Sequence, residues 1–137
     1  KASHHFDLAN WWIGDRPSRV FAECSRQFFG PGKGRFSGTR CRDCDHRNEC
    51  EFFYDQADVE RKRAELGYKV GTVPDYDGDH CVFSGDIDIY DTMAVTVRYR
   101  GGAVLNYSLN AGVPFEGWNL AINGTKGRLE SKITDNK

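Results

Sequence analysis

The stretch that decides the fold is residues 92–110, which read TMAVTVRYRGGAVLNYSLN. Apolar and polar residues alternate on both sides of the Arg-Gly-Gly tripeptide at residues 100–102, and this period of two is typical of half-buried strands. The glycines allow the chain to reverse direction between the two runs. The stretch therefore predicts two antiparallel strands, residues 92–99 and 103–110, joined by a tight turn.

A second hairpin is predicted further along the chain. Residues 118–122 and 127–131 flank the Asn-Gly dipeptide at 123–124, which is a strong turn signal. Upstream, residues 19–28 alternate well enough to form another strand. Together with a helix at the start of the chain, these segments predict the α+β class, with an open, mainly antiparallel β-sheet and helices on one face.

The chain starts with an amphipathic helix that Ser3 is expected to cap and Gly14 to end. Its apolar side chains recur at helical spacing, and they are Phe6, Leu8, Ala9, Trp12 and Ile13. A second, mostly polar helix is predicted over residues 55–66, with an Asp58–Lys62 pair of favourable orientation.

The composition excludes several classes of partner. The 137 residues suffice for one domain with a core, and 19 basic against 20 acidic residues leave a net charge of −1. This balance argues against a nucleic-acid partner and against an anionic membrane surface. No apolar run approaches the length of about 18 residues that a membrane-spanning helix needs. Five cysteines cannot all pair within one chain, and their spacing favours a reducing, cytoplasmic compartment.

The first helix carries the candidate catalytic group. His4 is the candidate proton acceptor, because an imidazole can accept and donate a proton near neutral pH; the alternative is a surface or capping histidine. Lys1, His5 and Asp7 complete the candidate substrate site. His5 points about 100° away from His4 around the helix, so it is either structural or lines the edge of the site. Lys1 would contact substrate hydroxyls or phosphate unless it is only a chain terminus, and Asp7 would orient His4 or cap the helix.

Three cysteines have the spacing of a metal site. Cys41 and Cys44, with two residues between them, can direct both sulfurs at one ion, and Cys50 can supply a third thiolate. Zinc prefers four tetrahedral ligands. The candidates for the fourth ligand are Cys81, His46, His80 and Cys24. A structural zinc ion is one interpretation of this cluster; free buried thiols, disulfides or an iron–sulfur cluster are the others.

Several motifs follow one another in a distinctive order over nearly the whole chain: residues 1–8 (KASHHFDL), residues 10–12 (NWW) with Gly14, the cysteine cluster, residues 81–88 (CVFSGDID) with Asp91, Gly101-Gly102 and residues 122–127 (INGTKG). Taken together they resemble the Gfo/Idh/MocA oxidoreductases, the relatives of glucose–fructose oxidoreductase and inositol dehydrogenase. Because the resemblance resumes at Cys81, this residue is favoured as the fourth zinc ligand beside Cys41, Cys44 and Cys50.

The resemblance implies that residues 1–137 are the C-terminal substrate-binding and oligomerisation domain, with a cysteine-rich insertion at about residues 38–83. NAD or NADP would bind an N-terminal Rossmann domain outside this sequence, where a lysine belongs to the catalytic set. His4 falls on the family's histidine position and Asp7 on the aspartate that follows, while the family's acidic residue would precede Lys1. We therefore expect a fragment that is inactive alone, and a homo-oligomer formed through a sheet face.

The leading functional hypothesis is the substrate-side domain of an NAD(P)-dependent oxidoreductase that transfers hydride to or from a sugar, cyclitol or similar polyol. Relatives that use the same hydride chemistry for glycoside cleavage leave net hydrolysis open. The alternative is a non-catalytic, zinc-stabilised interaction module. Arg40, Arg42 and Arg47 around the cysteines would suggest nucleic acid for such a module, but the overall charge balance argues against that partner.

Overall fold

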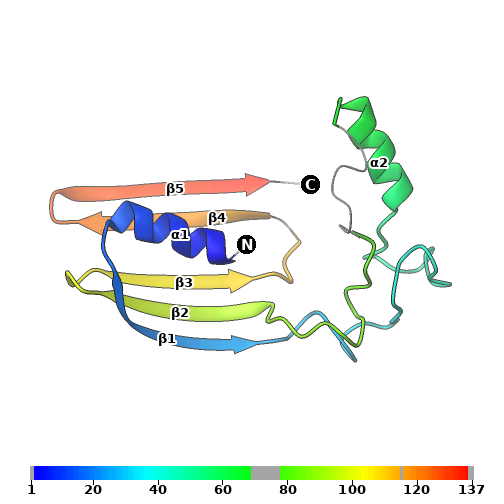
Figure 1. Ribbon diagram of the computed structural model, residues 1–137, viewed down its shortest axis with the longest axis horizontal. Helices are drawn as coiled ribbons and strands as arrows, with labels where there is room; N and C mark the ends of the chain where they lie inside the picture. Colours follow the sequence, from blue (N-terminus) through cyan, green and yellow to red (C-terminus); the bar gives the residue numbers. More distant parts are fainter. Residues whose placement is uncertain (1, 69–77, 115, 136–137) are drawn as a thin grey trace.

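The computed structural model describes residues 2–68, 78–114 and 116–135, and it contains two helices and two open antiparallel sheets (Figure 1). In chain order the elements are α1 (Ala2–Ile13), β1 (Pro17–Ser25), α2 (Gln56–Glu65), β2 (Thr92–Tyr99), β3 (Val104–Asn110), β4 (Glu116–Gly124) and β5 (Gly127–Asp135). The predicted α+β class is confirmed, and both predicted hairpins form.

Strands β1, β2 and β3 form one antiparallel sheet in that order. Val97 on β2 pairs with Val20 on β1 and with Leu105 on β3, while Val95 pairs with Tyr107. Residues directly opposite one another lie on the same face of a sheet. This register therefore gathers an apolar patch on one face, across all three strands.

Helix α1 lies against this apolar face (Figure 1). The core combines side chains from the helix and the sheet, namely Phe6, Ile13, Val95, Val97, Tyr99, Leu105 and Tyr107. Tyr99 is only 1% exposed, and its hydroxyl donates a 2.6 Å hydrogen bond to Oδ1 of Asn10, which ties the helix to the sheet. Gly14 ends the helix with a φ of 66°, as the sequence predicts.

Two details of the predicted helix are wrong. Ser3 lies within α1 rather than at its N-cap, because the helix already includes Ala2. Leu8 and Trp12 do not widen the buried stripe, since they are 43% and 46% exposed. Helical periodicity turns both of them away from the side of the helix that Phe6 and Ile13 share, and the sheet does not reach around to cover them.

Strands β4 and β5 form a separate two-stranded sheet, paired in regular register along its whole length. The predicted open, antiparallel architecture is confirmed, but the strands divide between two sheets, and among the described residues no pairing joins β4 to β3. The connection between them contains Gly112 and Pro114, both of which weaken a strand ladder. The alternation still gives this hairpin an apolar face, whose members are 41–52% exposed: Trp118, Ile122, Leu129 and Ile133.

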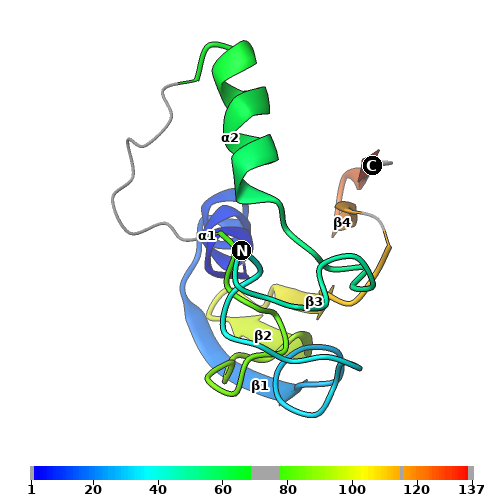
Figure 2. The ribbon, with the colours of Figure 1, turned by 90° about the vertical axis from the view of Figure 1, so that its right-hand side faces the viewer.

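Residues 26–91, which we call the excursion, leave the first sheet after β1 and return at β2 (Figures 1 and 2). Helix α2 begins after Asp55, whose side chain accepts a 3.1 Å hydrogen bond from the backbone N–H of Asp58. The predicted Asp58–Lys62 ion pair is present at 2.7 Å. None of the residues of α2 is buried, and the helix stands away from both sheets. Helix α1 thus covers a face of the first sheet, whereas α2 buries none of its residues.

Asp91 ties both ends of the excursion together. Its buried carboxylate accepts hydrogen bonds of 2.8–2.9 Å from the backbone N–H groups of Gln27, Phe28 and Phe29, and one of 3.0 Å from the Thr92 hydroxyl. Burial raises the pKa of Asp91, but the hydrogen bonds outweigh burial and lower this pKa to about 2. The carboxylate is therefore ionised and fully engaged at neutral pH.

Candidate functional site

The outward face of α1 carries the predicted proton acceptor. His4 and Asp7 are exposed, and Leu8 and Trp11 follow on the same side of the helix, three to seven residues beyond His4. Trp11 is 77% exposed. Among the described residues no hydrogen bond or ion pair joins His4 to Asp7, so an orienting role for Asp7 stays a prediction. Lys1 lies outside the described residues.

His5 is half-buried and turns toward the first sheet. Its Nδ1 lies 2.9 Å from the hydroxyl of Tyr107 on β3, and Phe6 packs on the same tyrosine with ring centroids 4.7 Å apart. Burial raises the pKa of Tyr107, so its hydroxyl keeps its proton at neutral pH and can donate it to the imidazole. The contact anchors the first turn of α1 and gives His5 a structural function, while its contact with substrate stays a prediction.

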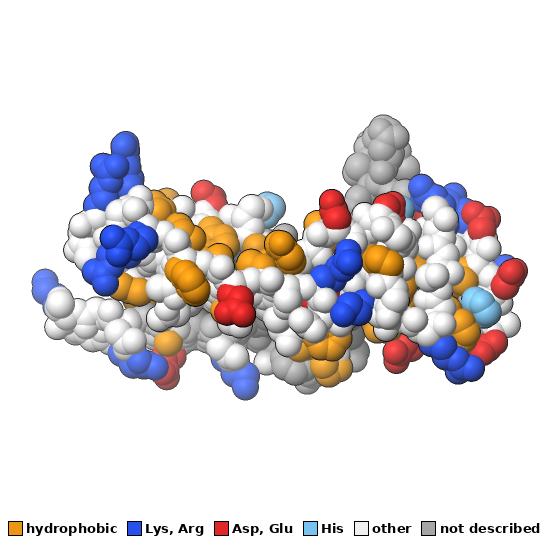
Figure 3. Space-filling view, turned by 90° about the horizontal axis from the view of Figure 1, so that it is seen from below, with side chains coloured by type: hydrophobic (Ala, Val, Ile, Leu, Met, Phe, Trp, Pro, Cys, Tyr) orange, Lys and Arg blue, Asp and Glu red, His pale blue; other side chains and the backbone are white. Residues whose placement is uncertain are grey.

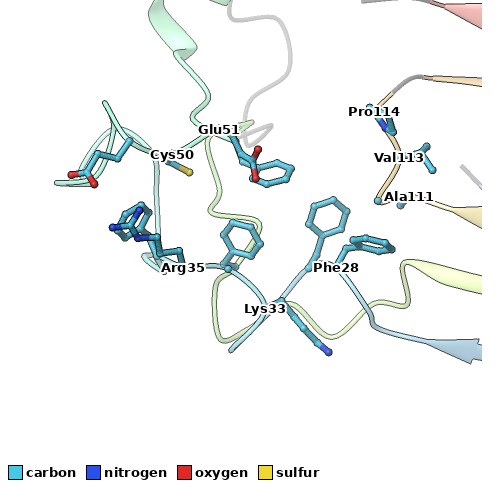
Figure 4. Close-up of a pocket in the computed structure, with 15 residues that line it drawn as sticks. Phe28, Lys33, Arg35, Cys50, Glu51, Ala111, Val113 and Pro114 are labelled. Carbon is cyan, nitrogen blue, oxygen red and sulfur yellow. The ribbon is translucent and has the colours of Figure 1, made fainter.

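A pocket of about 660 Å³ lies away from α1, between the excursion and the connection from β3 to β4 (Figure 4). Five aromatic side chains line it: Phe28, Phe29, Phe36, Phe52 and Phe83. Gly34 and Gly112 let the backbone approach two of these rings, because a Cβ at either glycine would collide with Phe83 or Phe28 respectively. The predicted residues of α1 are not among the lining residues. Sequence analysis missed this pocket, because its walls come from four separate segments.

Two segments of the excursion bring Cys41 and Cys81 together. Arg40 and His80 form an isolated antiparallel bridge. Across it the backbone N–H of Cys41 donates to the carbonyl of Asp79 at 2.7 Å, and the N–H of Cys81 donates to the carbonyl of residue 39 at 2.9 Å. In this arrangement the two cysteines are diagonal neighbours on one face of the bridge.

The other two cysteines come from turns that follow the bridge. The backbone N–H of Cys44 donates to the carbonyl of Cys41 at 3.1 Å, and that of Cys50 to the carbonyl of His46 at 3.0 Å. All four predicted cysteines, Cys81 included, line one small cavity of about 20 Å³. Burial raises the pKa of the Cys41 thiol. All five cysteines of the chain are free thiols, and no three His, Cys, Asp or Glu side chains of the described ranges are arranged to hold a metal ion.

The three alternative candidates for the fourth ligand make other contacts or lie outside the excursion. The His46 ring stacks on Phe36, with centroids 4.1 Å apart and planes 12° apart. Nε2 of His80 lies 3.1 Å from Oδ1 of Asp86. Cys24 lies in β1, away from the excursion. Of the four candidates named from the sequence, Cys81 is the one that lines the cavity with the other three cysteines.

The arginines near the cysteines do not form a basic patch. Asp79 is fully buried, and its carboxylate binds Arg40 at 3.0 Å and Arg42 at 2.7 Å. On the face shown in Figure 3, basic and acidic side chains are interspersed. Two of the three arginines thus share one buried carboxylate, and the absence of a nucleic-acid partner stays a prediction.

Comparison with known proteins identifies the family. Residues 1–130 match the family model described as the GFO/IDH/MocA C-terminal domain. The chain belongs to the GFO/IDH/MocA family. This confirms the resemblance read from the sequence motifs, and the α+β architecture with two open antiparallel sheets is consistent with the C-terminal domain of that family.

A relative of this GFO/IDH/MocA chain comes from Bacillus subtilis (strain 168) and is named "Putative oxidoreductase YteT". The two are 38% identical over 146 aligned positions, which cover 96% of this chain and 33% of the relative. The chain thus spans about a third of the length of that protein. No solved structure matches the chain significantly. No helix within the described ranges is long and apolar enough to cross a membrane.

Proposed function

We propose that this chain is the substrate-side domain of an NAD(P)-dependent oxidoreductase that moves a hydride to or from a sugar, cyclitol or similar polyol. The observation that carries the proposal is His4, an exposed histidine on the outward face of α1, within the segment that the family model matches. Trp11 is 77% exposed and neighbours the exposed Leu8 and Trp12 on the helix, so the three side chains form an apolar patch of the kind that marks an interaction surface.

The residues of this chain do not suit a dinucleotide, so we propose that another domain holds it. The glycines at positions 30, 32 and 34 lack the spacing of a dinucleotide fingerprint, and the next helix, α2, begins only at Gln56. No helix N-terminus therefore follows this loop to face a pyrophosphate. When bound, the nicotinamide supplies the hydride acceptor or donor.

In this proposal His4 accepts the proton in one direction of the reaction and returns it in the other. During oxidation of an alcohol, a ring nitrogen of His4 takes the hydroxyl proton while hydride leaves the carbon that bears this hydroxyl. In the reverse direction the imidazolium returns the proton to the carbonyl oxygen. His5 holds the first turn of α1 on β3 through Tyr107, and Lys1, His5 and Asp7 are the side chains proposed to contact substrate.

Binding of the dinucleotide tests whether the cofactor site lies outside these 137 residues. These 137 residues alone are expected to bind neither NAD nor NADP and to reduce neither, because the sequence contains no G-x-G-x-x-G motif that would cradle a pyrophosphate. The full-length protein is expected to bind one of the two and to reduce it with a polyol or sugar from a substrate panel. Isothermal titration of both samples with each dinucleotide makes the measurement. Submicromolar binding by the 137 residues would refute the domain assignment.

We also propose that the intact protein is a homo-oligomer formed through the open face of the first sheet. The helix α1 covers the face of Val95 and Val97, which leaves Ala94 and Thr96 on the opposite, exposed face. A two-layer interface between such faces would bury them. Ala94→Arg is expected to shift the protein toward monomers in analytical ultracentrifugation. Ala57→Arg, on exposed helix α2, is the matched control and should leave the oligomer intact. A wild-type protein that stays monomeric at high concentration would contradict the proposal.

A further inference from the structure

The four cysteines that line the small cavity come from three separate places in the excursion, and backbone hydrogen bonds fix each place. The bridge between Arg40 and His80 sets the positions of Cys41 and Cys81. Turns closed by backbone bonds set Cys44 and Cys50. All four cysteines therefore line the same small cavity, and no disulfide joins any of them.

The cavity has room for one small ligand, and four thiols outnumber the other two polar residues of its lining, Ser37 and Arg40. Its volume of about 20 Å³ exceeds the roughly 10–15 Å³ that one water molecule needs. A buried water also needs two to four good polar partners, whereas thiols are weak donors and weak acceptors. Most of the remaining lining is apolar and includes the rings of Phe36, Phe52 and Phe83. Four thiols around a cavity of this size suit a metal ion that prefers sulfur ligands better than they suit a water molecule.

We propose that Cys41, Cys44, Cys50 and Cys81 bind one structural zinc ion as a tetrathiolate site. Zinc–sulfur bonds near 2.3 Å require the four sulfurs to lie within about 4 Å of one another. The thiols surround the cavity without yet forming a ligand group, so binding must draw them inward. A cysteine has one rotatable side-chain bond, and a change of rotamer moves its sulfur without moving the backbone. The four thiols release their protons on binding, which leaves a site of charge −2.

The role of this metal is to close the excursion. Cys41 and Cys50 lie before α2 and Cys81 lies after it, so one ion joins the two halves of a segment whose helix buries no side chain. Four protein ligands leave no open position for substrate, so the metal is structural rather than catalytic. The site does not depend on the proposed oxidoreductase function, and its metal content can be measured without an activity assay.

Metal analysis of the full-length protein, purified without added metal, tests the site. We expect about one zinc ion per chain, as a four-ligand site requires. Serine in place of Cys41, Cys44, Cys50 or Cys81 is expected to weaken zinc binding by more than the roughly 10–100-fold that loss of a supporting group costs. The matched control is Cys24→Ser, in which zinc content should equal that of the wild type. Equal zinc loss in Cys24→Ser, zinc retained in the Cys81→Ser variant, or iron in place of zinc would overturn the assignment.

Two further measurements keep the test informative if a serine variant fails to fold. Cobalt(II) in place of zinc should give sulfur-to-metal charge-transfer absorption in the wild type and in Cys24→Ser. Chelation of wild-type protein should speed hydrogen exchange at the amides of Cys41 and Cys81 while those of β2 stay protected. A metal-free wild-type protein in which the four cysteines are found in disulfides or react as independent thiols would overturn the proposal.

Discussion

His4→Ala is expected to lower kcat of the full-length protein by roughly 10²–10⁴-fold, the usual contribution of a positioned general base. The imidazole is exposed on the outward face of α1 and belongs to no core contact, so its removal should leave the fold intact. The measurement is steady-state reduction of NAD or NADP with the best substrate of a polyol and sugar panel, together with a thermal unfolding curve. The rate should fall while the unfolding midpoint stays within a degree or two of the wild type.

Ser3→Ala provides the matched control for this variant, because Ser3 is exposed on the same turn and carries no proposed role. It should retain wild-type turnover and stability. A His4→Ala protein with near-normal turnover would remove His4 from the mechanism. A variant that loses activity together with its folded structure would assign His4 to stability instead.

Asp91→Asn is expected to cost the folded state about 2 kcal/mol at neutral pH, since an amide cannot accept all the hydrogen bonds that the carboxylate now accepts from three backbone N–H groups and Thr92. For a domain of this size the loss corresponds to a fall of roughly 5–10 °C in the unfolding midpoint. Thermal unfolding followed by circular dichroism measures this change.

The same carboxylate predicts a dependence on pH. The folded pKa of about 2 lies below the ordinary value of 3.8, so the folded state is stabilised above pH 3.8 and this stabilisation is lost as the pH falls toward 2. The difference of about two pH units corresponds to roughly 2 kcal/mol. Asp91→Asn should flatten the stability curve between pH 4 and pH 2, whereas Asp88→Asn, an exposed neighbour, should leave it steep. An unchanged slope in Asp91→Asn would show that other groups govern acid unfolding.

The strands were predictable because period-two alternation and turn residues are local properties. Residues 92–99 match β2 as predicted, and the Asn-Gly turn at 123–124 lies where β4 meets β5. Separation into two sheets was not predictable, because alternation indicates which face is apolar and not which strands pair. The helix at 55–66 was correctly predicted from its polar pattern and its charge pair, yet those features do not indicate whether a helix covers a sheet.

In the candidate site, too, local features were predictable from the sequence and long-range contacts were not. Local motifs indicated His4, His5 and the cysteines, and the structure gathers all four predicted cysteines at one cavity. The contact between His5 and Tyr107 joins residues 102 positions apart, and no local pattern predicts it. The aromatic pocket was missed for the same reason, since a run such as Phe28-Phe29 indicates burial but not the partner that provides it.

The excursion leaves and rejoins the first sheet at neighbouring points, so its length can change while the sheet stays the same. Its two ends meet at the sheet, where the backbone N–H of Asp91 donates to the carbonyl of Ser25 at 3.2 Å. Because the sheet fixes both attachment points side by side, lengthening or shortening the segment between them costs only the slowly growing entropy of loop closure. The same three-stranded frame can therefore carry inserts of very different size. We expect a short turn that replaces residues 30–90, and keeps the three N–H groups of residues 27–29 that bind Asp91, to leave strand pairing intact, so new binding surfaces can be gained or lost at this junction without redesigning the domain.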